Sequence, residues 1–280
     1  MSKTWLITGA SAGLGRLLTE RLLARGEKVA ATVRRPQVLQ DLAARHPDTL
    51  CVYTMDLTDT QAIHATVEQA FADFGRIDIL VSNAGYGVLG TAEDATDAQV
   101  RHIIDTNLVG SIALIRAALP HLRKQGGGHV LQLSSEGGQI AYPGFSLYHA
   151  SKWGIEGFVE ALSKELAPFD IKFTLVEPGP TATNFVAGTV RPALSPAYAG
   201  TPADQVRSGI DSGAFAVTGD AGKVVLRMIE MVDAGHAPLR LTLGASAYRG
   251  IRAALLQRLA ELEAQQAIAE SVELSDEAAR

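Results

Sequence analysis

Cysteine is nearly absent from this sequence, and Cys51 is its only thiol. Because a disulfide needs two thiols, none can form within the chain, and we expect a reducing, cytoplasmic location. The seven histidines show none of the close spacings that bind zinc, so we expect no metal site. Cys51 itself lies in the apolar run LCVYTM, which we interpret as a buried strand.

Clustered positive charge is absent as well. The formal net charge is -5, the isoelectric point is near 5.8 and the basic residues are dispersed, which argues against binding to nucleic acid. We find no stretch of the length needed to cross a bilayer and expect no membrane contact. The first residues, MSKTWLITGA, turn into a strand too early for a signal peptide.

What is present is a regular alternation of short apolar runs and longer amphipathic segments. Helices are expected at about 14–25, 38–45, 60–74, 97–124, 148–167 and 221–233. Seven strands are expected between them, in KTWLIT, KVAATV, CVYTM, DILVSN, HVLQLSS, IKFTLVE and LRLTL. This order predicts an α/β fold, a doubly wound parallel sheet of about seven strands with helices on both faces.

Two segments depart from this alternation. Residues 184–216 are rich in Pro, Gly, Ala and Ser, which predicts a loop or small helices that form a lid or a binding wall. Residues 245–280 begin with an amphipathic helix and finish with an acidic end. Because no repeat or low-complexity linker separates these parts, we interpret residues 1–280 as a single domain.

A glycine-rich turn, TGASAGLG, lies between the first strand and the first helix. Gly9, Gly13 and Gly15 allow a tight turn and the close approach of a pyrophosphate, whose charge would meet free N–H groups at the helix start. A glycine motif alone is weak evidence, but this position within an α/β pattern is the one used by dinucleotide sites. Ser11 could add a hydroxyl to the same phosphate.

Arg34 and Arg35 follow the second strand, and no carboxylate lies between Lys28 and Gln40. At this point of a dinucleotide site an acidic residue binds ribose hydroxyls, whereas an arginine accommodates a 2′-phosphate. The pair therefore favours NADP(H) over NAD(H). The alternative is a solvated arginine pair, although cations at the start of the next helix oppose its dipole.

Tyr148 and Lys152 lie one helical turn apart, so both side chains are expected on one face. An ammonium beside a phenol favours the ionised phenol, whose ordinary pKa is about 10. Lowering that pKa to near neutrality needs about three units, or roughly 4 kcal/mol. The pair is therefore a candidate acid/base, with Tyr148 as the group that exchanges the proton.

These motifs together resemble the short-chain dehydrogenase/reductase family over about residues 3–185. The resemblance is carried by the glycine turn, Asn83-Ala84-Gly85, Asn107, Ser135, Tyr148, Lys152 and Pro178-Gly179, in this order. It implies a Rossmann-type sheet, a nicotinamide dinucleotide and the interconversion of alcohols and carbonyls. It also implies a catalytic tetrad of Asn107, Ser135, Tyr148 and Lys152. Ser135 is preferred to Ser134 because its distance from the tyrosine is the one that the family uses.

The resemblance further implies a set of cofactor-binding positions. They are Gly9, Ser11, Gly13, Leu14, Gly15, Arg34, Arg35, Asp56, Leu57, Asn83, Ala84, Gly85, Tyr148, Lys152, Pro178, Gly179, Thr181 and Thr183. Asp56 resembles an adenine-contacting residue, but it could equally cap the helix that begins near Thr60.

The function expected from these residues is an NADP(H)-dependent carbonyl reductase or alcohol dehydrogenase with Tyr148 as general acid/base. Two alternatives are a non-catalytic NADP(H)-sensing regulatory protein and an epimerase or dehydratase on the same scaffold. The C-terminal tail resembles the arm of the family that contains 17β-hydroxysteroid and retinol dehydrogenases. By analogy with such proteins, the helices at 97–124 and 148–167 are expected to form a homodimer surface.

The substrate is expected to be a small carbonyl or alcohol compound of apolar character. An apolar pocket is indicated by Tyr142, Phe145, Phe185, Leu194, Tyr198 and Phe215. His149 and Trp153 flank the Tyr148–Lys152 pair and are expected to be structural. Glu136 could touch a substrate, but we interpret it as a solvated loop carboxylate.

Overall fold

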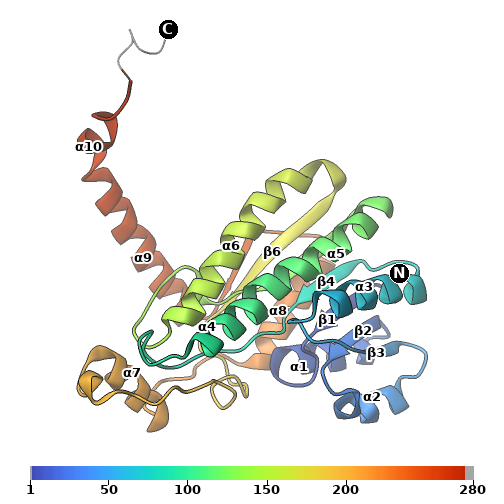
Figure 1. Cartoon of the computed structure of the whole chain (residues 1–280). Helices are drawn as coiled ribbons and strands as arrows, with labels where there is room; N and C mark the ends of the chain where they lie inside the picture. The colour runs from blue at the N-terminus through green and yellow to red at the C-terminus, as the bar shows by residue number, and fades with distance from the viewer. Residues whose placement is uncertain (1, 275–280) are drawn as a thin grey trace.

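The computed structural model describes residues 2–274, and within this range seven parallel strands form one sheet (Figure 1). The sheet order is β3-β2-β1-β4-β5-β6-β7. The strands are β1 (Thr4–Thr8), β2 (Lys28–Val33), β3 (Leu50–Thr54), β4 (Ile79–Ser82), β5 (Gly128–Leu133), β6 (Ile171–Pro178) and β7 (Arg240–Leu243). The predicted Rossmann-type, doubly wound sheet is confirmed.

Helices connect successive strands, and two more follow the last strand. They are α1 (Gly13–Ala24), α2 (Gln40–Arg45), α3 (Thr60–Phe74), α4 (Asp97–Ile104), α5 (Gly110–Lys124), α6 (Ser146–Leu166), α7 (Pro202–Asp211), α8 (Ala221–Asp233), α9 (Ala245–Glu263) and α10 (Gln266–Glu270). Short turns are η1 (Pro36–Leu39), η2 (Asp105–Val109), η3 (Glu136–Gly138), η4 (Ala167–Phe169) and η5 (Pro196–Tyr198). Most predicted helices are within two residues of these bounds.

Each face of the sheet has its own apolar core, because alternate side chains of a strand point to opposite faces. Leu6 of β1 packs in the core that α3, α5 and α6 cover. Its neighbours Trp5 and Ile7 pack in the other core, which α1, α2 and α8 cover. All three side chains are at most 1% exposed, so β1 is buried on both faces.

The direction of the connections changes beside β1. Leu6 pairs with Ala30 of β2 on one side and with Leu80 of β4 on the other. The loops that leave β1 and β4 therefore turn to opposite faces, and a crevice opens between them at the carboxyl ends of the strands. Such switch points are where open α/β sheets bind their ligands.

The edge of the sheet differs from the prediction for Cys51. Cys51, Val52 and Tyr53 of β3 are only partly buried, although we predicted a buried strand. The reason is that β3 pairs with β2 alone and is the outermost strand of the sheet. A strand in this position has no neighbour on one side, so an apolar run does not establish full burial.

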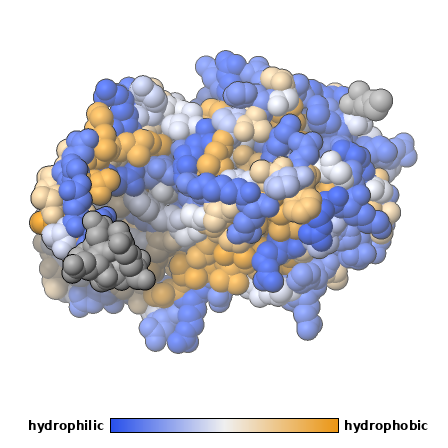
Figure 2. Space-filling model, turned by 90° about the horizontal axis from the view of Figure 1, so that it is seen from above, coloured by the Kyte–Doolittle hydropathy of each residue, from blue (hydrophilic) through white to orange (hydrophobic). Residues whose placement is uncertain are grey.

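The segment from Asp97 to Lys124 also differs from prediction. We expected no stretch long enough to cross a bilayer, and this prediction is wrong. The segments α4, η2 and α5 form one continuous helix of 28 residues, which is long and apolar enough to do so by length and composition alone. Half of its most apolar window is buried within the protein, however, as in a core helix. On the face shown in Figure 2, hydrophobic surface occurs as patches among hydrophilic residues.

The two segments outside the alternation contain helices of their own. The predicted substrate loop, 184–216, includes η5 and the ten-residue α7. In the tail, α9 and α10 project from the body of the molecule (Figure 1), and Leu255, Leu256 and Leu259 of α9 are each 50% exposed. Residues 275–280 of the predicted tail and single domain lie outside the described residues.

Candidate active site

A cleft of about 590 Å³ lies at the carboxyl ends of the strands, where the turns that follow β1 to β6 meet. Among the predicted site residues, those that line it are Gly9, Ser11, Gly13, Leu14, Arg34, Asp56, Leu57, Asn83, Ala84, Gly85, Ser135, Tyr148, Lys152, Pro178, Gly179, Thr181 and Thr183. Gly15, Arg35 and Asn107 lie outside this lining.

Two glycines of the turn are packed tightly against the protein, and the third is open toward the cleft. A Cβ on Gly9 would lie 2.8 Å from the Ala84 Cα, and one on Gly15 would lie 2.5 Å from the Gly9 carbonyl oxygen. Gly13 has a left-handed φ of 55° but meets only Thr183, at 3.7 Å. Gly9 and Gly15 are therefore required for the turn to pack on β4, whereas Gly13 leaves space toward the cleft.

The start of α1 faces this space. Its N-cap, Ala12, has no side chain that could accept a hydrogen bond, and the first turn of α1 holds no acidic residue. The N–H groups of the first turn thus lack the partners that a capping side chain would supply. A helix start of this kind, beside a glycine turn and a cleft, suits the phosphates of a dinucleotide.

Asn83 fastens the turn to the end of β4. Its side-chain amide donates hydrogen bonds to the carbonyl oxygens of Thr8 at 2.8 Å and Gly9 at 3.3 Å. Its backbone N–H donates to the Thr8 hydroxyl at 3.0 Å. These bonds hold the glycine turn and the Asn83-Ala84-Gly85 segment on two sides of the cleft.

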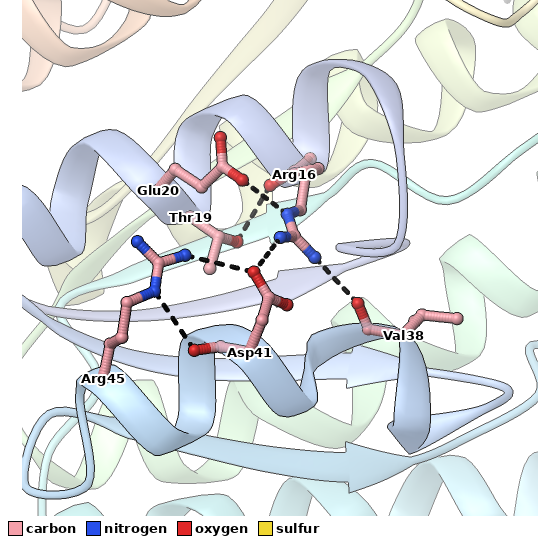
Figure 3. Close-up of polar contacts among 7 residues, drawn as sticks. Arg16, Thr19, Glu20, Val38, Asp41 and Arg45 are labelled. Carbon is pink, nitrogen blue, oxygen red and sulfur yellow. Dashed lines mark hydrogen bonds and ion pairs between the residues drawn. The ribbon is translucent and has the colours of Figure 1, made fainter.

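Arg16 holds the segment that follows Arg34 (Figure 3). From α1, its guanidinium donates to Glu20 at 2.6 Å, to the Val38 carbonyl oxygen at 2.8 Å and to Asp41 at 2.7 Å. The bonds to Val38 and Asp41 tie α1 to η1 and α2. The backbone after Arg34 is therefore fixed relative to the glycine turn, which sets where the Arg34 side chain enters the cleft.

Asp56 lies in the cleft but is not the helix cap that we considered as an alternative. Its carboxylate accepts hydrogen bonds from the Thr58 backbone N–H at 2.9 Å and the Thr58 hydroxyl at 2.8 Å. Asp59 caps α3 instead, by accepting from the Ala62 N–H at 3.0 Å. The hydrogen bond from the Thr58 N–H is the main cause that lowers the pKa of Asp56, and the nearby positive charge of Arg34 adds to it.

Asn107 lies behind the cleft wall, in the π-helical turn η2. Its side-chain oxygen accepts from the Tyr86 N–H at 3.0 Å, while its amide donates to the Tyr86 carbonyl oxygen at 2.8 Å and the Ser151 hydroxyl at 3.2 Å. The Asn107 side chain is 1% exposed, and both its oxygen and its amide nitrogen are hydrogen-bonded within the protein. The structure thus places Asn107 as a support for the wall rather than among the residues that line it.

Ser135, Tyr148 and Lys152 all line the cleft. Tyr148 is 6% exposed, and the nearby Ser135 hydroxyl acts to lower the pKa of its phenol. The Lys152 ammonium lies 5.6 Å from the centroid of the Tyr148 ring and donates to the Leu133 carbonyl oxygen at 2.8 Å. Tyr148 and Lys152 therefore lie on the same face of α6, as predicted.

The predicted acidity of Tyr148 is wrong for this arrangement. Burial raises the pKa of the phenol to about 12, and the charge of Glu136 adds to the increase, while the Ser135 hydrogen bond opposes it. Burial likewise lowers the pKa of Lys152 to about 8, against the opposing effect of Glu156. Spacing along the helix brings the amine near the phenol, but burial of both groups is the largest cause of both pKa shifts.

Ser134 is held away from Tyr148 by a buried network. Its hydroxyl donates to the Glu156 carboxylate at 2.5 Å, and Gln139 donates to the same carboxylate. Arg240 lies 3.5 Å from Glu156 and 3.4 Å from Glu177, so one guanidinium serves two buried carboxylates. Burial, followed by the charge of Glu156, raises the pKa of Glu177 to about 7.

Glu136 is not the solvated carboxylate that we predicted, because it is 7% exposed and lines the cleft. Sequence reasoning also missed His102, Thr106 and Tyr86, which line the cleft as well. These three residues carry no motif, and they reach the cleft only because the chain between β4 and α5 folds over it. A signal for them was therefore absent from the sequence.

The apolar end of the cleft agrees in part with prediction. Tyr142, Phe145, Phe185 and Phe215 line it, but Leu194 and Tyr198 do not. The Tyr198 hydroxyl instead donates to the exposed Glu93 at 2.7 Å. The loop composition indicated apolar side chains without indicating which of them turn inward.

His149 and Trp153 have the structural roles that we expected. The His149 Nδ1 lies 2.8 Å from the Gly137 carbonyl oxygen, and its Nε2 accepts from the Tyr142 N–H. The Trp153 Nε1 donates to the Ile140 carbonyl oxygen at 3.4 Å, and Arg258 of α9 lies over its ring. Within residues 2–274, no three His, Cys, Asp or Glu residues are grouped so that they could hold a metal ion.

Comparisons with known proteins identify the family of this chain. A family model described as short chain dehydrogenase matches residues 3–193. Oxidoreductase BOA17 from Botryotinia fuckeliana (strain B05.10) is 34% identical over 260 residues, which cover 91% of this chain and 94% of that protein. The 17-beta-hydroxysteroid dehydrogenase type 1 of Homo sapiens is 37% identical over 190 residues, covering 65% of this chain and 57% of that protein.

A solved structure is similar over nearly the whole length. It is a short-chain dehydrogenase from Streptomyces avermitilis, with 35% identity, a TM-score of 0.89 and coverage of 98% of this chain and 100% of that chain. Sequence motifs, fold and matched length thus agree, and the chain belongs to the short-chain dehydrogenase/reductase family of oxidoreductases.

Proposed function

We propose that this protein is an NADP(H)-dependent carbonyl reductase or alcohol dehydrogenase that acts on a ketone or aldehyde of largely apolar character. The observation that carries the proposal is the meeting of Ser135, Tyr148 and Lys152 in one cleft with the glycine turn. The bound cofactor would supply the hydride, and the residues of this chain would supply binding, orientation and the proton.

The two hydroxyls of the cleft have complementary tasks. Ser135 and Tyr148 both line the cleft, and the Ser135 hydroxyl acts on the Tyr148 phenol, so a carbonyl oxygen placed between the two hydroxyls would accept from both. Tyr148 then donates its proton to the developing alkoxide as a general acid, a contribution typically worth about 10²–10⁴-fold in rate. A pKa raised to about 12 keeps the phenol protonated at neutral pH, which suits the direction of reduction.

Lys152 prepares the same site. Its ammonium is anchored on the Leu133 carbonyl oxygen beside Tyr148, where it favours the phenolate that proton donation produces. Asn107 supports the adjacent wall through both backbone groups of Tyr86. With Lys152, it keeps the reacting groups in a fixed relation.

The preference for NADP(H) is supported by Arg34, which lines the cleft after β2, where no carboxylate is present to bind ribose hydroxyls. Solved proteins with this fold include one in complex with NAD and another with NADP bound. The fold therefore accommodates both cofactors, and the charge of Arg34 is the feature that distinguishes them here.

The test of this function is reduction of a panel of ketones by the wild-type protein and by Tyr148→Phe, followed by NADPH absorbance. We expect Tyr148→Phe to lower kcat at least about 100-fold, because the general acid is lost. Binding of NADPH, measured separately by its fluorescence, should change little. Turnover that survives in the variant would overturn the acid/base assignment, and a wild-type protein that binds NADPH without turnover would instead be a cofactor sensor.

We also propose a cytoplasmic homodimer. The composition and single thiol support the location. The exposed Val109 and Trp153 lie within the two helical segments expected at the dimer surface and are 47% and 42% exposed. Light scattering of the purified protein would give its mass in solution, and a monomer would contradict the proposal.

A further inference from the structure

Glu136 occupies an unusual position for a carboxylate. It follows Ser135 directly and begins η3, where its carbonyl oxygen accepts from the N–H groups of Gln139 at 2.9 Å and Ile140 at 3.0 Å. The residue is 7% exposed and lines the cleft. The backbone of Glu136 is thus fixed, and its side chain lies at the substrate end of the site.

The carboxylate lacks the partners that a buried charge normally has. Within the described residues, no hydrogen bond or ion pair of this carboxylate is found, and burial raises its pKa. Glu156, which is buried to a similar degree, is instead bound by Ser134, Gln139 and Arg240. Neither carboxylate oxygen of Glu136 is among the fully buried, unpartnered polar atoms of the described residues, so both are open to the cleft that Glu136 lines. A partner for this carboxylate would therefore enter from the cleft, as water or as a ligand.

The surroundings define what that partner can be. The charge of Glu136 acts on the phenols of Tyr142 and Tyr148, both of which line the cleft. Phe145 and Phe185 line the same end. A ligand here would need an apolar body and one polar group that can donate a hydrogen bond to a carboxylate.

We propose that Glu136 determines substrate specificity by accepting a hydrogen bond from a hydroxyl or ammonium group that the substrate carries beside its reacting carbonyl. The backbone of Ser135 is extended, so its side chain and that of Glu136 leave the chain in different directions. The closeness to the carbonyl is instead indicated by Tyr148, its proposed proton donor, because Glu136 lines the same cleft and its charge acts on the Tyr148 phenol. The substrate class is therefore an apolar ketone with a donor on the neighbouring carbon. The inference rests on the proposed function, since it needs a carbonyl at Ser135 and Tyr148.

The experiment uses three ketones with the same apolar skeleton, which carry a hydroxyl, an amine or only hydrogen on the carbon next to the carbonyl. We expect wild-type kcat/KM to favour the donor-bearing ketones, and Glu136→Leu to lower kcat/KM for them by about tenfold to hundredfold. The plain ketone should be reduced as well as before or better. Glu263→Leu, the same change at an exposed residue of α9, is the control and should leave all three values unchanged.

Glu136→Gln separates the two donors and guards against a folding defect. Its amide oxygen still accepts from a hydroxyl but has no charge to attract an ammonium, so a preference for the amine should fall further than one for the alcohol. Equal losses for all three ketones, or no loss, would overturn the inference, because Glu136 would then act on Tyr148 or on nothing. A wild-type protein that reduces all three equally also overturns it, whereas failure to reduce any ketone with either cofactor contradicts the proposed function itself.

Discussion

Arg34 and Arg35 are adjacent in the chain but lie in different surroundings. Arg34 lines the cleft, and its charge helps to lower the pKa of Asp56. Arg35 has an extended backbone at the start of η1 and lies outside the cleft lining. The two arginines follow the same strand, but only Arg34 lines the cleft. We therefore expect Arg34, rather than both residues, to contact the cofactor.

This difference can be measured with two variants. Arg34→Ala should raise the KM for NADPH by about tenfold or more while changing the KM for NADH little, because a charge-assisted bond to the 2′-phosphate is lost. Arg35→Ala is the matched control and should affect both cofactors only slightly. A uniform rise for NADPH and NADH in the Arg34 variant would contradict contact with a 2′-phosphate.

At the scale of elements, the contact between η3 and α6 holds the segment with the proposed catalytic residues in place. Gly138 of η3 lies so close to α6 that a Cβ would be 2.0 Å from the Glu156 carboxylate oxygen and 2.6 Å from the Ser134 hydroxyl. Ser135 and Glu136 immediately precede this contact, and Tyr148 and Lys152 lie on α6. Close packing of the two elements thus sets the distance between Ser135 and the Tyr148–Lys152 pair.

Gly138→Ala should therefore destabilise the protein by about 1–3 kcal/mol, the usual cost of overpacking. Gly157→Ala is the control on the same helix, because a Cβ there meets nothing within 4 Å. This control should stabilise the protein by about 0.5–1 kcal/mol, since alanine loses less backbone entropy than glycine in a helix. Urea unfolding of both variants would give the two values, and equal midpoints would refute the packing argument.

At the scale of the whole molecule, β6, β7 and α6 are joined by charged and polar contacts. Glu177 at the end of β6 accepts from the Thr242 hydroxyl of β7 at 2.9 Å, and Arg240 of β7 bonds Glu160 of α6 at 2.8 Å. The pKa of Glu177 is raised from 4.5 to about 7. Between these two values the folded protein holds a proton that the unfolded chain has released, so its stability falls as pH rises.

Glu177→Gln should remove this dependence, because an amide does not ionise. Relative to the variant, the wild-type protein should lose up to about 3 kcal/mol of unfolding free energy between pH 4.5 and 7, at about 1.4 kcal/mol per pKa unit. Urea unfolding at pH 5 and pH 8 would show the difference, and the comparison cancels the contributions of other groups. Parallel changes in the two proteins would mean that Glu177 ionises normally.

The sequence by itself determined the sheet, the order of its elements and the position of the glycine turn, because these follow from local periodicity and from residues that only certain backbones tolerate. The sequence also determined that Tyr148 and Lys152 lie close together, because residues four apart on a helix share a face. Two predictions were wrong for the same reason: that Glu136 is solvated, and that the pKa of Tyr148 is lowered. Burial depends on what distant segments cover, and neighbours in the sequence do not reveal it.

Only the tertiary structure decided which side chains enter the cleft. Leu194 and Tyr198 lie outside it, whereas Glu136 and His102 line it. The titratable side chains of the cleft lie where η3, α6 and the turns after the strands converge. The packing there sets how well each side chain is solvated and which groups it contacts, and these two factors determine its charge state. The sequence predicted a candidate acid/base pair beside a glycine turn, and the packing decided how strongly each group holds its proton.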